Sequence, residues 1–258
     1  NMKTNNMKTT PASKSKFLAT TLALTAGLLI GSANAATIAV DDIGTFFHPY
    51  SNVPSDRKWT LDSTALGGFD ASGSDKLVLT FGGENQTSGY DEISFGGVAM
   101  TRIVFAEPGG QDVSIWYLDN PGTGNLVVDL KAGNGIGLSV LALSNTADGF
   151  ATTANAAGVS TSINTTGLNS FVVAAGERNN QSSLVAEGDL TQVYSGDAGS
   201  SSHGSAYQQV ATSGTTITPT FTSAEGVVAV EFLSVVPEPS TTALIGLGGL
   251  ALILRRRK

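Results

Sequence analysis

The chain of 258 residues contains no cysteine. Disulfide bonds, thiolate zinc sites and cysteine nucleophiles are therefore excluded. Histidine is nearly as scarce: His48 and His203 lie far apart, with no Gly-x-Ser-x-Gly elbow or His-Glu-x-x-His motif beside them. We expect His203 to be solvated in a Ser/Gly-rich loop and His48 to pack in an aromatic corner. The protein is accordingly predicted not to be an enzyme.

Basic residues are also rare in the middle of the chain. Residues 36–236 hold 6 of the 14 Lys and Arg but 20 of the 21 Asp and Glu, which gives this part a formal charge of about −14. Nucleic acid and anionic lipid are poor partners for such a surface, because both require positive counter-charge. Divalent cations or neutral glycans suit it better.

Long amphipathic helical periodicity is missing from the same part, whereas glycine is abundant at 31 residues and serine and threonine are plentiful. This combination predicts short strands joined by many turns. The fold class is predicted to be all-β, an antiparallel β-sandwich of jelly-roll or Ig-like kind over residues 36–236. An N-terminal signal helix and a C-terminal hydrophobic helix are expected to flank it.

The N-terminal segment is basic and then apolar. Lys3, Lys8, Lys14 and Lys16 precede the apolar run 17–30. Ala33 and Ala35 then supply a small-x-small cleavage pattern, so residues 1–35 are predicted to be a secretory signal peptide and Ala36 the first residue of the mature chain.

The C-terminal segment, residues 237–258, has three parts. Pro237, Glu238 and Pro239 end the upstream fold, because proline fixes its own φ and pushes its predecessor toward an extended conformation. An uncharged apolar run covers 241–254, and four cations end the chain: Arg255, Arg256, Arg257 and Lys258. As a helix the apolar run is about 21 Å long, against about 30 Å for the hydrocarbon core of a bilayer, so it spans only with snorkelling and local thinning.

This tripartite tail resembles the PEP-CTERM sorting signal of Gram-negative bacteria. The resemblance implies recognition by a membrane-embedded exosortase at the sorting motif, namely Val236, Pro237, Glu238, Pro239 and Ser240. The terminal cations would stop transfer on the cytoplasmic side, leaving the sandwich on the far side. An ordinary permanent tail anchor is the alternative. We expect export through the secretion translocon, transient anchoring, and a final location at the cell surface or in an extracellular matrix with exopolysaccharide.

Alternating and apolar runs place the strands. Gly96 and Gly97 separate the runs 91–95 and 98–105 and predict a hairpin, because primed turns need positive φ at both central positions. Alternation in 125–131 predicts a strand with one wet face. Further strands are expected at 37–40, 59–61, 76–81, 112–118, 137–144, 158–164, 170–176, 190–194, 206–211, 215–221 and 227–236. Loops are expected at 145–157 and 195–205, with an irregular aromatic stretch at 46–50.

The segments 93–101, 113–124 and 125–130 resemble a recurrent β-sandwich module of secreted bacterial proteins, with a Gly-Gly-x-x-Met-Thr hairpin and an Ile-Trp-Tyr-Leu strand. The resemblance covers about residues 70–235. It implies a fold rather than an activity.

A glycan-binding module, with or without calcium, is the alternative function. Of Trp116 and Tyr117 one must face outward by alternation and would offer a sugar-stacking ring. Trp59 and Tyr207 are further aromatic candidates.

Oxygen donors are the remaining candidate ligands. Asp70 and Asp75, with the neighbouring serines, and the pair Asp41 and Asp42 place oxygen donors in turns where Ca²⁺ would bind, although the distal Glu of an EF-hand is missing. Acid pairs such as Asp91 with Glu92, or Glu177 with Asp189, leave a secreted hydrolase as a third hypothesis, and no spacing selects one pair.

Overall fold

Five strands are buried along most of their length, and they form the centre of the molecule. In the computed structural model these are β3 (Lys76–Glu84), β7 (Gln111–Asp119), β9 (Ile136–Ser144), β12 (Ser170–Arg178) and β16 (Gly226–Phe232). Their side chains are buried at successive positions rather than at alternate ones. A strand of this kind must be covered on both faces of its sheet.

The structure describes residues 35–48, 54–84, 90–130, 135–179, 183–197 and 201–236. Residues 35–235 form one compact unit. Within the described residues the chain is antiparallel β-structure, with a 3₁₀ turn at Pro108–Gly110. The predicted signal helix and C-terminal hydrophobic helix lie outside the described residues.

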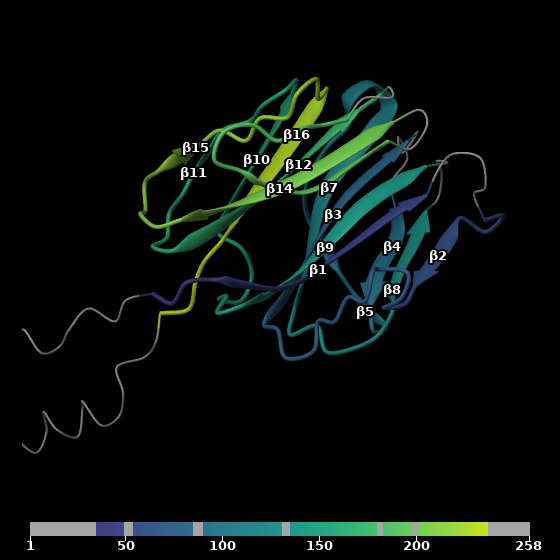
Figure 1. Cartoon of the computed structure of the whole chain (residues 1–258), viewed down its shortest axis with the longest axis horizontal. Coiled ribbons are helices and arrows are strands. Elements are labelled where there is room, and N and C mark those ends of the chain that lie inside the picture. The colour runs from purple at the N-terminus through teal and green to yellow at the C-terminus, as the bar shows by residue number, and fades with distance from the viewer. Residues whose placement is uncertain are drawn as a thin grey trace, which may run out of the picture. The chain divides into compact units, whose positions relative to one another are not determined.

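The strands form three larger sheets and one small one (Figure 1). The central sheet has the order β1-β9-β3-β7-β6, with β1 at Ala39–His48 and β6 at Thr101–Ala106. The second has the order β10-β16-β12-β14-β13, with β10 at Thr152–Ala157, β13 at Thr191–Asp197 and β14 at Ser202–Val210. The third has the order β2-β8-β4-β5, with β2 at Lys58–Leu61, β4 at Tyr90–Phe95, β5 at Val98–Ala99 and β8 at Leu126–Leu130. Strands β11 (Ile163–Asn164) and β15 (Thr216–Ile217) pair separately.

Alternate side chains of the central sheet enter two different cores. Leu79 of β3 packs in a cluster with Ile93 and Val128 of the third sheet, while its neighbour Val78 packs with Val173 and other residues of the second sheet. The second sheet is covered in turn on its outer face, where a third cluster includes side chains of β11 and β15. The result is a sandwich of three main layers, with the central sheet in the middle.

Several predicted elements are confirmed. Gly96 and Gly97 have φ of 57° and 80° and join β4 to β5, as the Gly-Gly pair predicts, but the second run divides, and β6 leaves the hairpin for the central sheet. Strand β8 alternates between buried and half-buried side chains, as expected of a strand with one wet face. The chain is all-β and antiparallel, while the jelly-roll or Ig-like assignment stays a prediction.

Other predictions are wrong at particular segments. The first strand extends beyond the predicted 37–40, and the described part of the irregular stretch expected at 46–50 is also strand, because β1 pairs with β9 along its whole length through a bulge at Asp41. The loop expected at 145–157 contains the edge strand β10, whose Ala and Asn side chains carry little strand signal. The loop expected at 195–205 is mostly the facing ends of β13 and β14, where Gly and Ser fill space between sheets.

The layering gives a direct stability prediction for two adjacent residues. Val78→Ala and Leu79→Ala should both destabilise the protein, by about 2 and about 3 kcal/mol, because each leaves a void in a different core. Urea unfolding measures both. Leu168→Ala, at a side chain that is 57% exposed, is the control and should stay within about 0.5 kcal/mol of wild type. A neutral result at Val78 or Leu79 would mean that one face of the sheet is open to water.

Candidate functional site

The last described residues, 233–236, follow strand β16 and precede the predicted sorting tail. After β16 the amide of Ala147 donates to the carbonyl of Leu233 at 2.9 Å, and the amide of Val235 donates to the carbonyl of Asn145 at 3.0 Å. We call residues 233–235 the strap. The next residue, Val236, is 63% exposed. The backbone is thus bonded to the body up to the residue before Val236.

The beginning of the described chain meets the strap. The amide of Ala36 donates to the carbonyl of Val235 at 3.1 Å. The Asn169 side chain donates to the carbonyl of Ala35 at 2.5 Å, and the Asn145 side chain donates to the carbonyl of Thr37 at 3.0 Å. We call this group of contacts the clasp. It brings the predicted signal-cleavage bond beside the start of the predicted sorting tail.

Of the residues predicted for these two processing sites, Ala35, Ala36 and Val236 are described. Ala33, Pro237, Glu238, Pro239 and Ser240 lie outside the described residues, as do Arg255, Arg256, Arg257 and Lys258. Their predicted roles are therefore judged from the sequence and from the point at which the fold ends.

The two segments proposed for calcium come together in space. The Ser74 hydroxyl donates to Asp41 at 2.7 Å, and the amide of Asp70 donates to Asp42 at 2.8 Å. Asp75 accepts from the amide of Thr146 at 3.2 Å. These carboxylates therefore brace the turn 70–75 against β1 and against the connection that follows β9.

Asp70 is used within its own turn. The amide and hydroxyl of Ser72 both donate to it at 2.8 Å and hold the pKa of its carboxyl below the usual range. Among the described residues no group of three or more His, Asp or Glu side chains is arranged to hold a metal ion. Calcium binding at Asp70 and Asp75 stays a prediction, and the contacts account for these acids without it.

The expected sugar-stacking residues do not present an open ring. Trp116 is buried between the central and third sheets, where its Nε1 donates to the Ser114 hydroxyl at 3.0 Å. Tyr117 is half-buried on the opposite face, against Phe232 of the second sheet. The expectation that one of the two faces outward is wrong, because the central sheet is covered on both faces.

The other two aromatic candidates are also packed. Trp59 is buried in the core and meets the ring of His48 edge-on at 5.7 Å. His48 therefore lies in an aromatic corner, as predicted. Tyr207 stacks on Phe171 at 4.8 Å between the central and second sheets.

His203 differs most from its prediction. It is 3% exposed, on β14 opposite Glu177 of β12, and not in a solvated loop. Its Nε2 lies 3.2 Å from the Thr80 hydroxyl, and its Nδ1 lies 3.4 Å from a Glu177 carboxylate oxygen. Thr80 continues to the Ser139 hydroxyl at 2.8 Å. We call these side chains the polar network.

Glycine makes room for the polar network. A Cβ at Gly82 would overlap both the Glu177 carboxylate and the His203 ring, and one at Gly137 would lie 3.0 Å from the Cβ of His203. Gly82 and Gly137 are paired across β3 and β9. Paired glycines inside otherwise apolar strands were the available sequence signal for a large group inserted between sheets.

The polar network orders hydroxyl, imidazole and carboxylate as a hydrolase triad does, but all three side chains are buried. Burial lowers the pKa of His203 to about 3, against an opposing contribution from a hydrogen bond with the Gly176 backbone. The ring is therefore neutral near pH 7. The geometry indicates a role in joining two sheets.

A known protein family matches the part of the chain that begins at the last residue of the strap. Residues 235–258 match the family described as PEP-CTERM protein-sorting motif. The chain carries a PEP-CTERM sorting signal. This signal indicates export and sorting by an exosortase, with transient anchoring in the membrane.

No curated protein and no solved structure matches the chain. Within the described residues, no helix has the length and apolarity needed to cross a membrane. The β-sandwich predicted for the PEP-CTERM chain is present in the structure.

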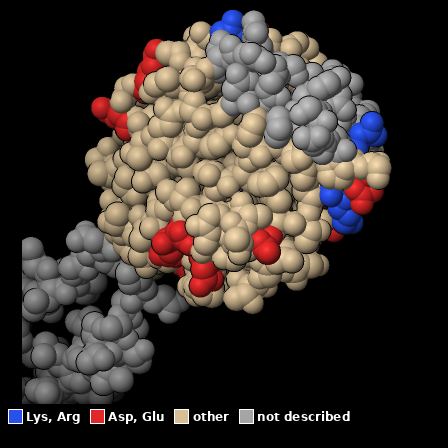
Figure 2. All heavy atoms as spheres, turned by 45° about the vertical axis from the view of Figure 1, so that its right-hand side comes forward, with Lys and Arg blue, Asp and Glu red and all other residues tan. Residues whose placement is uncertain are grey.

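The surface of the PEP-CTERM body follows its composition. Figure 2 shows separate groups of Asp and Glu on one face, with few Lys and Arg among them. An acidic body is repelled by anionic lipid, so its surface charge does not favour attachment to a membrane.

A buried lysine stands at the clasp end of the sandwich. The Lys76 ammonium pairs with Asp119 and lies 4.9 Å from the ring centroid of Tyr117. Burial lowers the pKa of Lys76 to about 8, opposed by the charges of Asp148 and Asp75. Asp119 also accepts from the amide of Gly149 at 3.0 Å, so the pair fixes the connection from the central to the second sheet.

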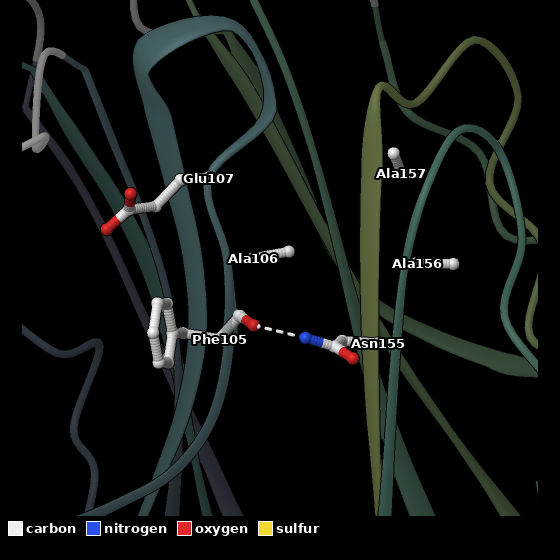
Figure 3. Close-up of a pocket in the computed structure, with 6 residues that line it drawn as sticks. All are labelled: Phe105, Ala106, Glu107, Asn155, Ala156 and Ala157. Atoms are coloured by element: carbon white, nitrogen blue, oxygen red, sulfur yellow. Dashed lines mark hydrogen bonds between the residues drawn. The ribbon is translucent and has the colours of Figure 1, made fainter.

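A groove of about 480 Å³ lies between the edge strands β6 and β10. The Asn155 side chain crosses it and donates to the carbonyl of Phe105 at 2.8 Å. Figure 3 shows the Phe105 ring and the Glu107 carboxylate on the side of β6 away from Asn155. The groove is lined by Phe105, Ala106, Glu107, Asn155, Ala156 and Ala157, so Glu107 is its single charged residue.

The buried imidazole predicts a loss of stability in acid. The unfolded chain takes up the His203 proton near pH 6.5 and the folded chain only near pH 3, so the stability of wild type should fall by about 1.4 kcal/mol per pH unit as the pH drops through this window. Urea unfolding of wild type and His203→Gln measures the difference, which the variant should lack.

His48→Gln is the matched substitution at the half-buried histidine outside the polar network, and it should leave the acid slope in place. If wild type instead gains stability over His203→Gln in acid, then His203 is charged and paired with Glu177, and our account of the polar network is wrong.

The buried lysine predicts a gain of stability at the alkaline end of the pH range. Between about pH 8 and 10.5 the unfolded chain still holds the Lys76 proton and the folded chain has released it, so wild type should gain up to roughly 3 kcal/mol over Lys76→Met as the pH rises. Lys58→Met, at an exposed lysine paired with Asp129, is the control and should not show this gain. A loss over the same range would show that Asp119 stabilises the ammonium more than burial destabilises it.

Proposed function

We propose that this protein is a non-enzymatic component of the cell surface or of an exopolysaccharide-containing extracellular matrix. The tail anchors it after export, until an exosortase cuts near Pro237, Glu238 and Pro239. The observation that carries this proposal is the sorting-motif match at 235–258, which begins at the last residue bonded to the sandwich. A cut beyond Val236 would therefore spare every backbone contact of the strap.

The burial of the candidate catalytic and aromatic groups in the described part of the body supports a non-enzymatic role. The hydroxyl, imidazole and carboxylate that come closest to a catalytic arrangement are buried between two sheets. The predicted aromatic platforms are packed inside the cores or against them. What the described surface offers is an acidic, three-layered scaffold suited to a hydrated matrix.

The same proposal includes removal of the signal peptide between Ala35 and Ala36. Both processing steps then act at one end of the sandwich, because Ala36 and Val235 are hydrogen-bonded to each other. The mature body would comprise approximately the unit 35–235 that the structure shows as compact.

The composition of the extracellular form tests the proposal. Intact mass and C-terminal sequencing of protein recovered outside the cells should show a product that lacks Arg255–Lys258, because a cut near the motif removes the apolar run together with its cations. Recovery of the intact C-terminus from the extracellular protein would contradict processing and favour a permanent anchor.

The motif itself is tested by Glu238→Ala, which should keep the protein in the membrane fraction with its C-terminus intact. Glu187→Ala removes an exposed carboxylate from a loop of the body and is the matched control. It should be released as wild type is. Equal release of both variants would exclude Glu238 from recognition.

A further inference from the structure

The folded body covers the backbone beside one of the two proposed processing sites and exposes it beside the other. The proposed signal-cleavage bond joins Ala35 to Ala36, and both of its polar groups are engaged in the clasp. The Ala35 carbonyl accepts from the Asn169 side chain at 2.5 Å, and the Ala36 amide donates to the Val235 carbonyl at 3.1 Å. The Ala35 residue is itself 7% exposed.

A peptidase needs these same groups free. It binds the substrate as an extended strand through backbone hydrogen bonds, takes the small residue before the bond into a pocket, and places the scissile carbonyl in an oxyanion hole. In the folded body the Ala35 side chain is covered and its carbonyl already has a donor. Cleavage therefore requires the clasp to open.

The clasp is held by a buried part of the second sheet. Glu231 of β16 accepts hydrogen bonds from the amides of Thr166 and Gly167 at 2.8 and 3.0 Å, which orders the loop before Asn169. Gln209 donates to the carbonyl of Asn169 at 3.1 Å. Asn169 is thus positioned by the second sheet, through buried Glu231 and exposed Gln209, and opening its contact with Ala35 competes with this order.

The second processing site has no such cover on its N-terminal side. Val236 is 63% exposed, and it follows directly after the last residue of the strap. The chain that enters the sorting motif is therefore accessible while the body is folded.

We propose that folding of the sandwich closes the signal-cleavage site, so that the signal peptide must be removed before the strap docks, whereas the backbone at Val236 stays exposed. Hydrolysis uses one water to break the bond between the Ala35 carbonyl carbon and the Ala36 nitrogen, leaving a carboxylate on Ala35 and an amine on Ala36. The inference rests on the proposed cleavage position and is independent of the fate of the tail.

The order of synthesis provides the time for the first cut. Val235 follows Ala36 by about 200 residues, and at about 5–20 residues per second this leaves roughly 10–40 s before the strap emerges. After the cut, the new ammonium group of Ala36 still reaches the Val235 carbonyl, now through a charge-assisted hydrogen bond. Removal of the signal therefore preserves this part of the clasp.

A competition between folding and cleavage tests the proposal on the full chain. Precursor is denatured in urea, diluted into detergent buffer, and given a purified signal peptidase after increasing delays. Fluorescence of Trp59 and Trp116, both buried, follows folding. The fully folded precursor should be cut at least about tenfold more slowly than the freshly diluted chain, because only the opened fraction reacts. The cleavable fraction should fall at the rate of folding.

Two substitutions to glycine separate the clasp from general stability. Asn169 and Asn120 both have φ of 50°, a conformation that glycine adopts readily. Asn169→Gly removes the donor to Ala35 and should raise cleavage of the folded precursor about fivefold, the equivalent of one hydrogen bond. Asn120→Gly makes the same change outside the clasp and should leave the rate as in wild type.

Equal cleavage of folded and unfolded precursor would overturn the proposal. So would N-terminal sequencing that places the cut elsewhere than before Ala36. Failure of the tail to be processed in cells would contradict the proposed function and would leave these rates unchanged, so the two failures are distinguishable.

Discussion

The structure depends on a central sheet whose three inner strands have water on neither face. Strands β3, β7 and β9 bury successive side chains, so the sandwich needs the third sheet on one face and the second sheet on the other. About 200 residues are enough for this because the strands are short and glycine permits close approach between layers. Neither Trp116 nor Tyr117 can then serve as an outward platform. The sorting signal lies outside this sandwich, at residues 235–258.

Polar groups between the central and second sheets lie at opposite ends of that interface. The Lys76 and Asp119 pair is near the clasp, since β3 starts there, and the polar network of His203, Glu177 and Thr80 is toward the other end of β3. Buried polar groups of this kind add little net stability, but they disfavour other registers of the two sheets, in which they would lose their partners. The clasp end thus has a fixed geometry, and the tail leaves from a defined position.

Much of this architecture could be predicted from the sequence, and the features that could not be predicted share a physical cause. The Gly96 and Gly97 hairpin and the alternation in β8 depend on local rules, and the sorting tail is a local motif; all three were predicted correctly. The burial of His203 depends on a partner strand 26 residues away, Glu177 on β12, and on space left by Gly82, so local Ser/Gly composition suggested a loop. Likewise, no local sequence pattern predicts that a third sheet covers Trp116, or that the Asn169 side chain bonds to Ala35.

The central claim is that the fold ends at the strap, so that the sorting tail can be removed without disturbing the sandwich. Amide hydrogen exchange, compared between the mature chain with its tail and the released form, tests it most directly at the amides of Ala36, Ala147 and Val235, which are bonded in the clasp and strap. The account predicts equal protection of these amides in both forms. Loss of protection on release would contradict it, because the tail would then be part of what holds the body together.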